Sequence, residues 1–217
     1  MPALLLPEEI EALFTREDGS YAFARWGRPI APIVFGVTDE TLGTVKGAVE
    51  AVMTLAGHQM AETDPELGAN LMFFFFREWK ELLEVPDLDR MIPSLASLVN
   101  RLSKEGASQY RAFRFDDDGG IQAAFVFLRM SGPLADVPAE TLALTQAVQV
   151  TLMWGPEAFA EVSPLAVLPE NGNTILRPEI AGVIAAAYDR MMPVAAQDAS
   201  HALRLYARLQ ALPEGTA

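Results

Sequence analysis

The most aromatic block of the chain is Leu71–Phe76, in which four phenylalanines follow one another. A strand with one face in water alternates apolar and polar side chains, and this block does not alternate. It is also far shorter than the ~20 apolar residues that a membrane-spanning helix requires. Both faces of the segment are therefore expected to be covered, as in a central strand with helices packed on each side.

Several other segments repeat their apolar residues every three to four positions, which is typical of helices that bury one face. The clearest helix is expected to be capped by Asp39 and to end at Gly57, a residue suited to the left-handed position after a helix. Further helices are predicted over residues 7–14 and 78–84, from Pro93 to before Gly106, from Pro138 through Trp154, from Pro178 to before Pro193, and from Asp198 or Ser200 onwards.

Extended segments are predicted at residues 21–26, 30–37 and 58–62. Pro32 cannot donate a hydrogen bond to a neighbouring strand, so its strand should be bulged or lie at an edge. The strongest local signal is a β-hairpin, in which residues 110–115 and 121–130 flank the loop Asp-Asp-Asp-Gly-Gly at 116–120. The three aspartates lack the ligand spacing of a calcium loop, so a solvated turn is expected.

Together these elements predict an α+β fold with a mixed, twisted sheet of four to five strands covered by helices. The 217 residues are 51% apolar, which is enough for the core of a single domain. Within that domain we expect a strand-containing part over residues 20–154 and a C-terminal lobe of loops and helices over residues 155–217.

The charge balance limits the classes of partner. Lys and Arg number 16 against 29 Asp and Glu, a net charge of −13. A nucleic acid or an anionic membrane surface requires a cationic surface, so neither partner is expected. The chain has no cysteine and two histidines, which excludes thiolate chemistry and a histidine-rich metal centre. The N-terminal segment lacks the basic residues of a signal peptide and is broken by Pro7, so a cytoplasmic location is expected.

One histidine has carboxylates close to it in sequence. On a strand, His58 and Glu62 would face the same side, and Asp64 follows shortly after. General acid–base catalysis would need these groups in a buried, convergent pocket, whereas a solvent-facing strand edge explains the same residues. His201, beside Ser200 and Asp198, is explained by helix capping and surface solvation.

The order of the predicted elements is that of the upper subdomain of zincin-type metallopeptidases, and of metzincins in particular. In those enzymes the helix after the hairpin carries H-E-x-x-H, whose histidines hold zinc while the glutamate activates water. Here the segment Leu144-Thr145-Gln146 resembles the end of the E-E-L-T-Q pattern of a bacterial family of unknown function that looks like inactivated zincins. The stretch from Leu176 to Met191 resembles that family's later L-x-x-L-Y-D-P segment, with Arg190 in place of the proline.

The resemblance implies that the metal site is absent. Leu142 and Gln146 stand where the two zinc histidines would be, and Ala143 stands where the glutamate would be. Leucine cannot bind zinc and alanine cannot take a proton from water, so neither a metal nor another cofactor is expected. Thr145 and Gln146 are polar groups in the middle of an apolar helix, so they are expected either to find buried hydrogen-bond partners or to line a remnant of the cleft. The candidates for this cleft are Thr145, Gln146, Gln149 and Tyr188.

The leading hypothesis is a catalytically inactive, zincin-like domain that binds a protein or peptide, or a second copy of itself. One alternative is a hydrolase of unrelated class that uses His58 with Glu62 or Asp64. Another is a small-molecule site in the remnant cleft near Gln146. In zincins the strand bordering the cleft keeps one edge open and substrate pairs with it. Residues 110–115 are the matching strand, and Arg111 and Arg114 would favour an acidic extended peptide.

Overall fold

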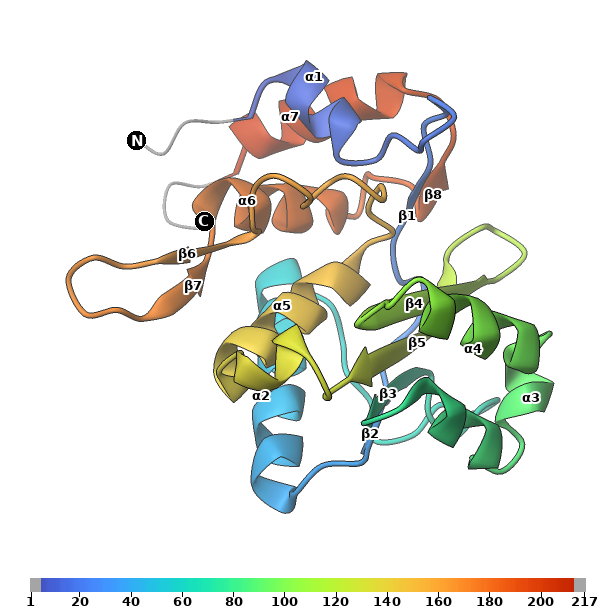
Figure 1. Cartoon of the computed structure of the whole chain (residues 1–217). Helices are drawn as coiled ribbons and strands as arrows, with labels where there is room; N and C mark the ends of the chain where they lie inside the picture. Colours follow the sequence, from blue (N-terminus) through green and yellow to red (C-terminus); the bar gives the residue numbers. More distant parts are fainter. Residues whose placement is uncertain (1–4, 213–217) are drawn as a thin grey trace.

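The chain is described by a computed structural model over residues 5–212. Its centre is a mixed sheet of four strands, in the order β2 (Pro32–Phe35), β3 (Leu71–Phe76), β5 (Ile121–Arg129) and β4 (Gln109–Phe115) (Figure 1). The strands β2, β3 and β5 are parallel, and β4 runs antiparallel to β5. The prediction of an α+β fold with a mixed sheet of four to five strands is confirmed.

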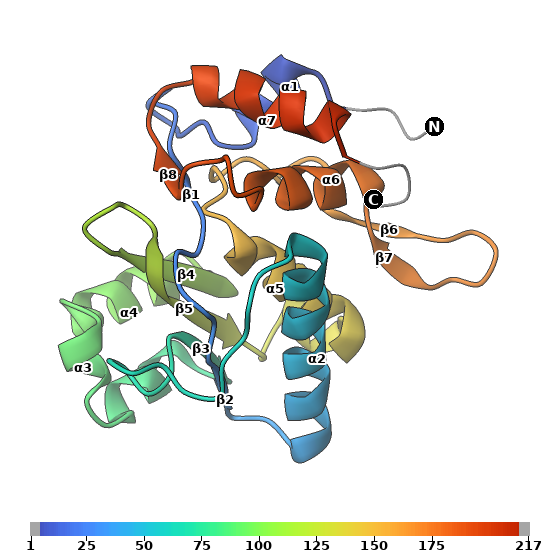
Figure 2. The same cartoon turned by 180° about the vertical axis from the view of Figure 1, so that it is seen from behind.

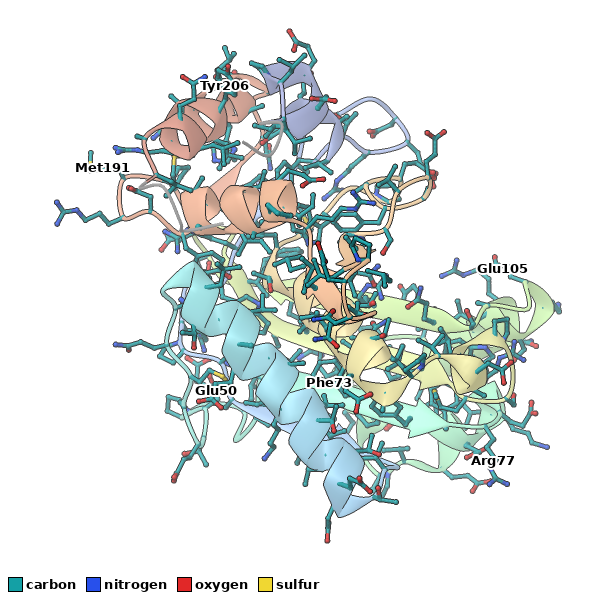
Figure 3. All side chains as sticks on the ribbon, turned by 90° about the vertical axis from the view of Figure 1, so that its left-hand side faces the viewer. Glu50, Phe73, Arg77, Glu105, Met191 and Tyr206 are labelled. Atoms are coloured by element: carbon teal, nitrogen blue, oxygen red, sulfur yellow. The ribbon has the colours of Figure 1, made fainter. Side chains whose placement is uncertain are left out.

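The aromatic strand β3 lies between two layers of helices. Phe73, fully buried, packs on the side of α2 (Asp39–Ala56) and α5 (Ala139–Thr151). Phe74 packs on the other side, with η1 (Trp79–Glu84) and α4 (Leu95–Lys104). Figure 3 shows Phe73 in the interior, whereas Glu50 points outward from α2. Four aromatic rings in succession are compatible with this strand because neither of its faces meets water.

The helix α2 ends as the sequence indicates but is capped differently at its start. Gly57 has φ of 65° and takes the left-handed position after the helix, as predicted. The prediction that Asp39 caps the helix is wrong. The N-cap is Thr38, whose hydroxyl accepts a hydrogen bond from the Thr41 amide at 3.4 Å. Asp39 begins the first turn, where its negative charge interacts favourably with the helix dipole.

The predicted hairpin is formed by β4 and β5, with an irregularity in register between Arg114 and Phe115. Asp116 accepts hydrogen bonds from the amides of Asp118 and Gly120, which closes the turn. Strand β2 occupies the opposite edge of the sheet, so the expectation from Pro32 is also confirmed. Short helices α3 (Leu88–Met91) and η2 (Pro133–Asp136) connect the larger elements.

The C-terminal lobe is built on α6 (Pro178–Ala187) and α7 (Ser200–Gln210). The first helix of the chain, α1 (Pro7–Ala12), packs against α7 and so belongs to this lobe in space (Figures 1 and 2). The lobe also contains a hairpin of β6 (Leu165–Val167) and β7 (Thr174–Leu176), which the sequence analysis assigned to a loop. Each of these strands has only three residues, too few to establish an alternating pattern.

Of two further predicted strands, one forms only in part and the other does not form. Within residues 21–26 only β1 (Phe23–Ala24) forms, and it pairs with β8 (Ala195–Ala196) in a separate two-stranded sheet. Residues 58–62 form no strand, since Met60 makes only an isolated bridge to Ile30. The helix predicted through Trp154 ends at Thr151 because Leu152 is extended and bridges to Arg25.

None of the helices within residues 5–212 has the length and apolar character needed to cross a membrane. The expectation about the N-terminal segment rests partly on residues 1–4, which lie outside the described residues.

Candidate functional site

The outer edge of β4 carries backbone groups that the sheet does not use. The Arg129 amide donates to the Ser108 carbonyl at 2.8 Å, and the strand register continues from that pair. In an antiparallel ladder this places the N–H and C=O groups of even-numbered residues toward β5, and those of Gln109, Arg111 and Phe113 on the open side. No loop or side chain of the described chain bonds these three amides. The edge is therefore available for another strand.

A hydrogen-bonded trio joins this edge to the helix α5. The Arg111 Nη1 atom donates to Gln146 Oε1 at 3.0 Å and to Gln109 Oε1 at 3.2 Å. Gln146 Nε2 in turn donates to Gln109 Oε1 at 3.0 Å. Gln146 is only 2% exposed, so its amide obtains its hydrogen bonds from β4 rather than from water. Removal of the guanidinium from water lowers the pKa of Arg111 to about 10, which leaves it charged at neutral pH.

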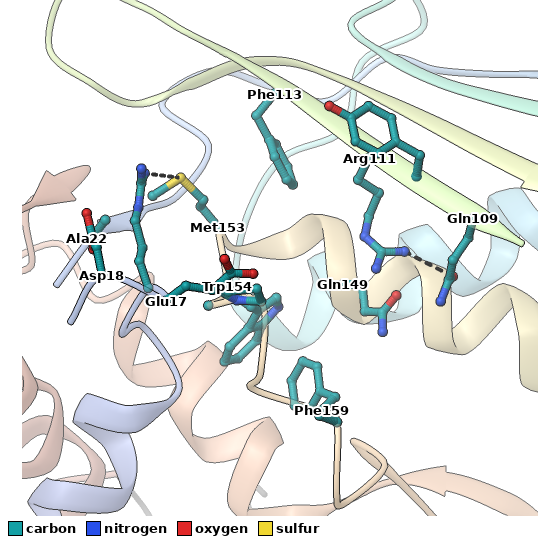
Figure 4. Close-up of a pocket in the computed structure, with 15 residues that line it drawn as sticks. Glu17, Asp18, Ala22, Gln109, Arg111, Phe113, Gln149, Met153, Trp154 and Phe159 are labelled. Atoms are coloured by element: carbon teal, nitrogen blue, oxygen red, sulfur yellow. Dashed lines mark hydrogen bonds between the residues drawn. The ribbon is translucent and has the colours of Figure 1, made fainter. Parts of the chain in front are cut away.

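A cavity of about 850 Å³ lies beside the trio, between β4, the end of α5 and the lobe that contains α1 (Figure 4). Gln109, Arg111 and Gln149 line one side. The opposite side includes Trp154, which stacks on Phe14 with ring centroids 5.3 Å apart. The cavity combines apolar walls with a few polar groups, as peptide and small-molecule sites do.

A second cavity of about 410 Å³ lies on the other face of β4, toward α4. Its walls include Leu98, Phe125 and Tyr110, and also Arg101 and Arg114. Because successive side chains of a strand point to opposite faces, a strand added beside β4 would direct alternate side chains toward the two cavities. The open edge and the two cavities thus form one continuous candidate site, which we call the β4 site.

The structure brings two of the four predicted cleft residues to the β4 site. Gln146 and Gln149 lie one turn apart on α5 and both face β4. Thr145 instead donates from its hydroxyl to the Thr141 carbonyl at 2.7 Å, one turn earlier on its own helix.

Tyr188 lies elsewhere, in the packing between α6 and the end of α5. Its hydroxyl donates to the Thr151 carbonyl at 2.7 Å, and the Arg25 guanidinium lies over its ring. Burial raises the pKa of Tyr188 well above its usual value. The residue therefore has a packing role, since its hydroxyl is already bonded away from the cavity.

The histidine considered for catalysis is not paired with either carboxylate. His58 Nε2 donates to the Arg28 carbonyl at 2.8 Å, and its ring packs against Tyr188. Asp64 is buried in its own turn, where it accepts from the amides of Glu66 and Leu67 and from Asn70. Burial lowers the pKa of His58. The hydrogen bonds of His58 and Asp64 thus hold backbone segments in place. Glu62 makes no hydrogen bond or ion pair to His58.

The three α5 residues that the sequence analysis compared with a zinc site, Leu142, Ala143 and Gln146, are all buried. Leu142 and Ala143 line a separate apolar cavity between the starts of α2 and α5, while Gln146 bonds β4. Within residues 5–212 no group of three or more His, Cys, Asp or Glu is placed to hold a metal ion.

Several residues of the β4 site escaped the sequence analysis, among them Gln109, Gly155 and Trp154. They come from segments that are far apart in the chain and carry no shared motif. The one available signal was the pair Arg111 and Arg114 on an aromatic strand of an acidic chain, which did indicate this edge.

Comparison of the chain with models of protein families, with curated proteins and with solved structures gave no match. Inference about its function therefore rests on the β4 site.

Proposed function

We propose that this chain is a catalytically inactive, zincin-like domain that binds an extended peptide as an additional strand beside β4. The observation that carries the proposal is the open edge at Gln109, Arg111 and Phe113, with a cavity on each face of the strand. In strand addition the main-chain hydrogen bonds supply affinity and the cavities for alternate side chains supply specificity.

The chain topology supports the relationship to zincins. The antiparallel strand β4 occupies the sheet edge, β5 follows it, and α5 then packs across the sheet beside α2. In zincins the substrate lies between the equivalent strand and helix. The proposed peptide would occupy the same place relative to β4 and α5.

Loss of catalysis follows from the side chains on α5. A zinc-bound water needs metal ligands and a base, and Leu142 and Ala143 offer neither. Gln146, at the third position, is already bonded to Arg111 and Gln109. The edge strand is thus held against the helix by hydrogen bonds where the active enzymes have a metal.

Charge around the edge supports an acidic peptide. Arg101, Arg111 and Arg114 line the cavities beside β4 in a chain whose net charge is −13. Arg101 is paired with Glu105 at 3.8 Å, whereas Arg111 has no carboxylate partner among the described residues. A cationic edge on an acidic protein steers acidic partners toward this strand.

The experiment uses a phage-displayed library of random decapeptides and two substitutions at one position. Phe113→Pro removes an outward-facing amide hydrogen without removing a bond to β5, and proline is tolerated at such edges. Phe113→Ala, the matched control, loses the same side chain but keeps the amide. We expect peptides captured by the wild type to be retained by Phe113→Ala and lost by Phe113→Pro, with both variants equally folded by circular dichroism.

The proposal fails if no peptide is enriched above background, or if the enriched peptides bind Phe113→Pro as well as Phe113→Ala. Concentration-dependent dimerisation that Phe113→Pro abolishes would instead identify a second copy of the chain as the added strand.

A further inference from the structure

The Arg111 guanidinium uses only one of its three nitrogen atoms for hydrogen bonds within residues 5–212. Both of its hydrogen bonds within the protein leave through Nη1, to Gln109 and Gln146. Its Nε and Nη2 atoms make no hydrogen bond in residues 5–212, and no Asp or Glu there lies within 4.0 Å of it. Arg111 lines the cavity of about 850 Å³ (Figure 4). The Nε and Nη2 hydrogens of arginine form the fork that binds both oxygens of a carboxylate.

An unsatisfied acceptor belongs to a second residue that lines the same cavity. The Oε1 atom of Gln149 is buried and has no hydrogen-bond partner, although Gln149 lines the same cavity. Buried side-chain acceptors are usually bonded, and Gln146, one turn earlier on α5, is bonded through both its oxygen and its nitrogen. Figure 4 labels both Gln149 and Arg111 among the side chains that line this cavity. The arrangement thus offers a cationic fork and an acceptor that needs an N–H group.

The other charged groups near β4 do not offer the same combination. Arg114 donates to the Met91 carbonyl, and Arg16 donates to the Met153 sulfur at 3.7 Å. Asp18, on the opposite side of the cavity, is occupied by Ser20, whose hydrogen bonds lower the pKa of that carboxyl group. A negative group is therefore favoured at the Arg111 end of the cavity.

We infer that the α5 side of the β4 site recognises a carboxylate together with a neighbouring amide N–H, the carboxylate at Arg111 and the N–H at Gln149. This inference rests on the proposed function and names the class of peptide: one with an aspartate or glutamate side chain, or a free C-terminal carboxylate, beside Arg111. A purely structural role for Arg111 would need Nη1 alone. It would not account for the fork and Gln149 Oε1, which have no hydrogen-bond partners within residues 5–212.

Small probes test the inference without requiring strand addition. N-acetylglutamate N-methylamide carries a side-chain carboxylate and amide N–H groups, and N-acetylglutamine N-methylamide is its neutral match. N-acetylalanine presents a terminal carboxylate. Each is titrated into ¹⁵N-labelled protein while the Arg111 Nε–H and the Gln149 side-chain amide resonances are followed, with the Arg101 Nε–H resonance as an internal control.

We expect at least one carboxylate probe to shift the Arg111 and Gln149 resonances to saturation and to bind about tenfold more tightly than the glutamine probe. The tighter of the two carboxylates identifies the source, side chain or C-terminus. Arg111→Lys keeps the charge but not the fork, so it should lose most of this preference, and Gln149→Ala should weaken binding of the probes without removing the preference for the charge.

The inference is overturned if neither carboxylate shifts the Arg111 resonance, or if the glutamine probe binds equally well. Retention of the preference in Arg111→Lys would also overturn it, because a point charge would then suffice. These failures differ from failure of the proposed function: peptide capture sensitive to Phe113→Pro would persist in a protein that ignores carboxylates. Carboxylate binding without peptide capture would leave a site for small acids.

Discussion

Arg111 on β4 and Gln146 on α5 are joined by a hydrogen bond of 3.0 Å from Nη1 to Oε1. The two residues are 35 positions apart in the chain, and Gln146 is almost fully buried. This contact holds the edge strand against the helix and fixes one wall of the cavity beside β4. Under the proposed relationship to zincins, this amide would stand in the place of a metal ligand and support the strand instead.

The first prediction concerns the energetic value of that contact. Gln146→Ala leaves Arg111 and Gln109 without their partner in a largely buried position, so the free energy of unfolding should fall by about 1–3 kcal/mol. The matched control is Gln149→Ala, one turn later, which removes an oxygen that has no partner and should change stability by less than about 0.5 kcal/mol. Urea unfolding followed by circular dichroism measures both. Equal effects of the two substitutions would mean that the trio does not stabilise the fold.

The second prediction concerns metal. Because Leu142, Ala143 and Gln146 provide neither a ligand set nor a base, purified protein should contain no stoichiometric zinc by elemental analysis. A chelator should leave the thermal midpoint unchanged, since no metal-binding free energy contributes to folding. About one zinc per chain, or a chelator-dependent loss of stability, would contradict the relationship to inactive zincins.

The third prediction concerns acid stability and rests on His201. This residue is 3% exposed, its Nδ1 atom lies 2.7 Å from the Tyr21 hydroxyl, and its Nε2 atom has no partner. Burial, with a smaller contribution from the charge of Arg204, lowers its pKa from 6.5 to about 4. The side chains that face it are Tyr21, in the segment between α1 and β1, and Phe23 on β1.

The direction of this pH dependence follows from the protons that His201 binds in the folded and the unfolded chain. Between pH 6.5 and about 4 the unfolded chain binds a proton at His201 that the folded chain does not, so stability is full above pH 6.5 and falls as the pH drops through this range. The loss from this group should be roughly 2–3 kcal/mol between pH 7 and 4.5. His201→Asn, which does not titrate, should lose that much less over the same interval in urea unfolding. Equal losses in both proteins would refute the assignment.

The sequence predicted those parts of the fold that local patterns determine. Four phenylalanines in succession require cover on both faces, and β3 is covered on both faces. A glycine-containing loop between two aromatic strands predicts a hairpin, and β4 and β5 form one. In contrast, β1 and β8 are each two residues long and pair only because the tertiary fold brings these distant segments together. No local pattern in the sequence predicts such a pair.

The site was predictable only in part, for a related reason. Gln146 and Thr145 were singled out because polar residues interrupt an apolar helix, yet Thr145 bonds the Thr141 carbonyl of its own helix. Tyr188 was placed with them by sequence alone, yet its hydroxyl bonds the Thr151 carbonyl away from the cavity. The cavity itself is assembled from three separated segments, around residues 16–22, 109–113 and 149–160, and no periodicity connects them.

Hydrogen exchange along β4 tests the central claim most directly, since the proposed function requires an edge that is open in the free protein. In a proven monomer, the outward-facing amides of Arg111 and Phe113 should exchange rapidly, while those of Tyr110 and Ala112, bonded to β5, should exchange slowly. Addition of a peptide selected on the wild type should slow the two outward-facing amides and leave the other two unchanged. Uniformly slow exchange of all four amides in the free monomer would show that the edge is already covered, and strand addition at β4 would be ruled out.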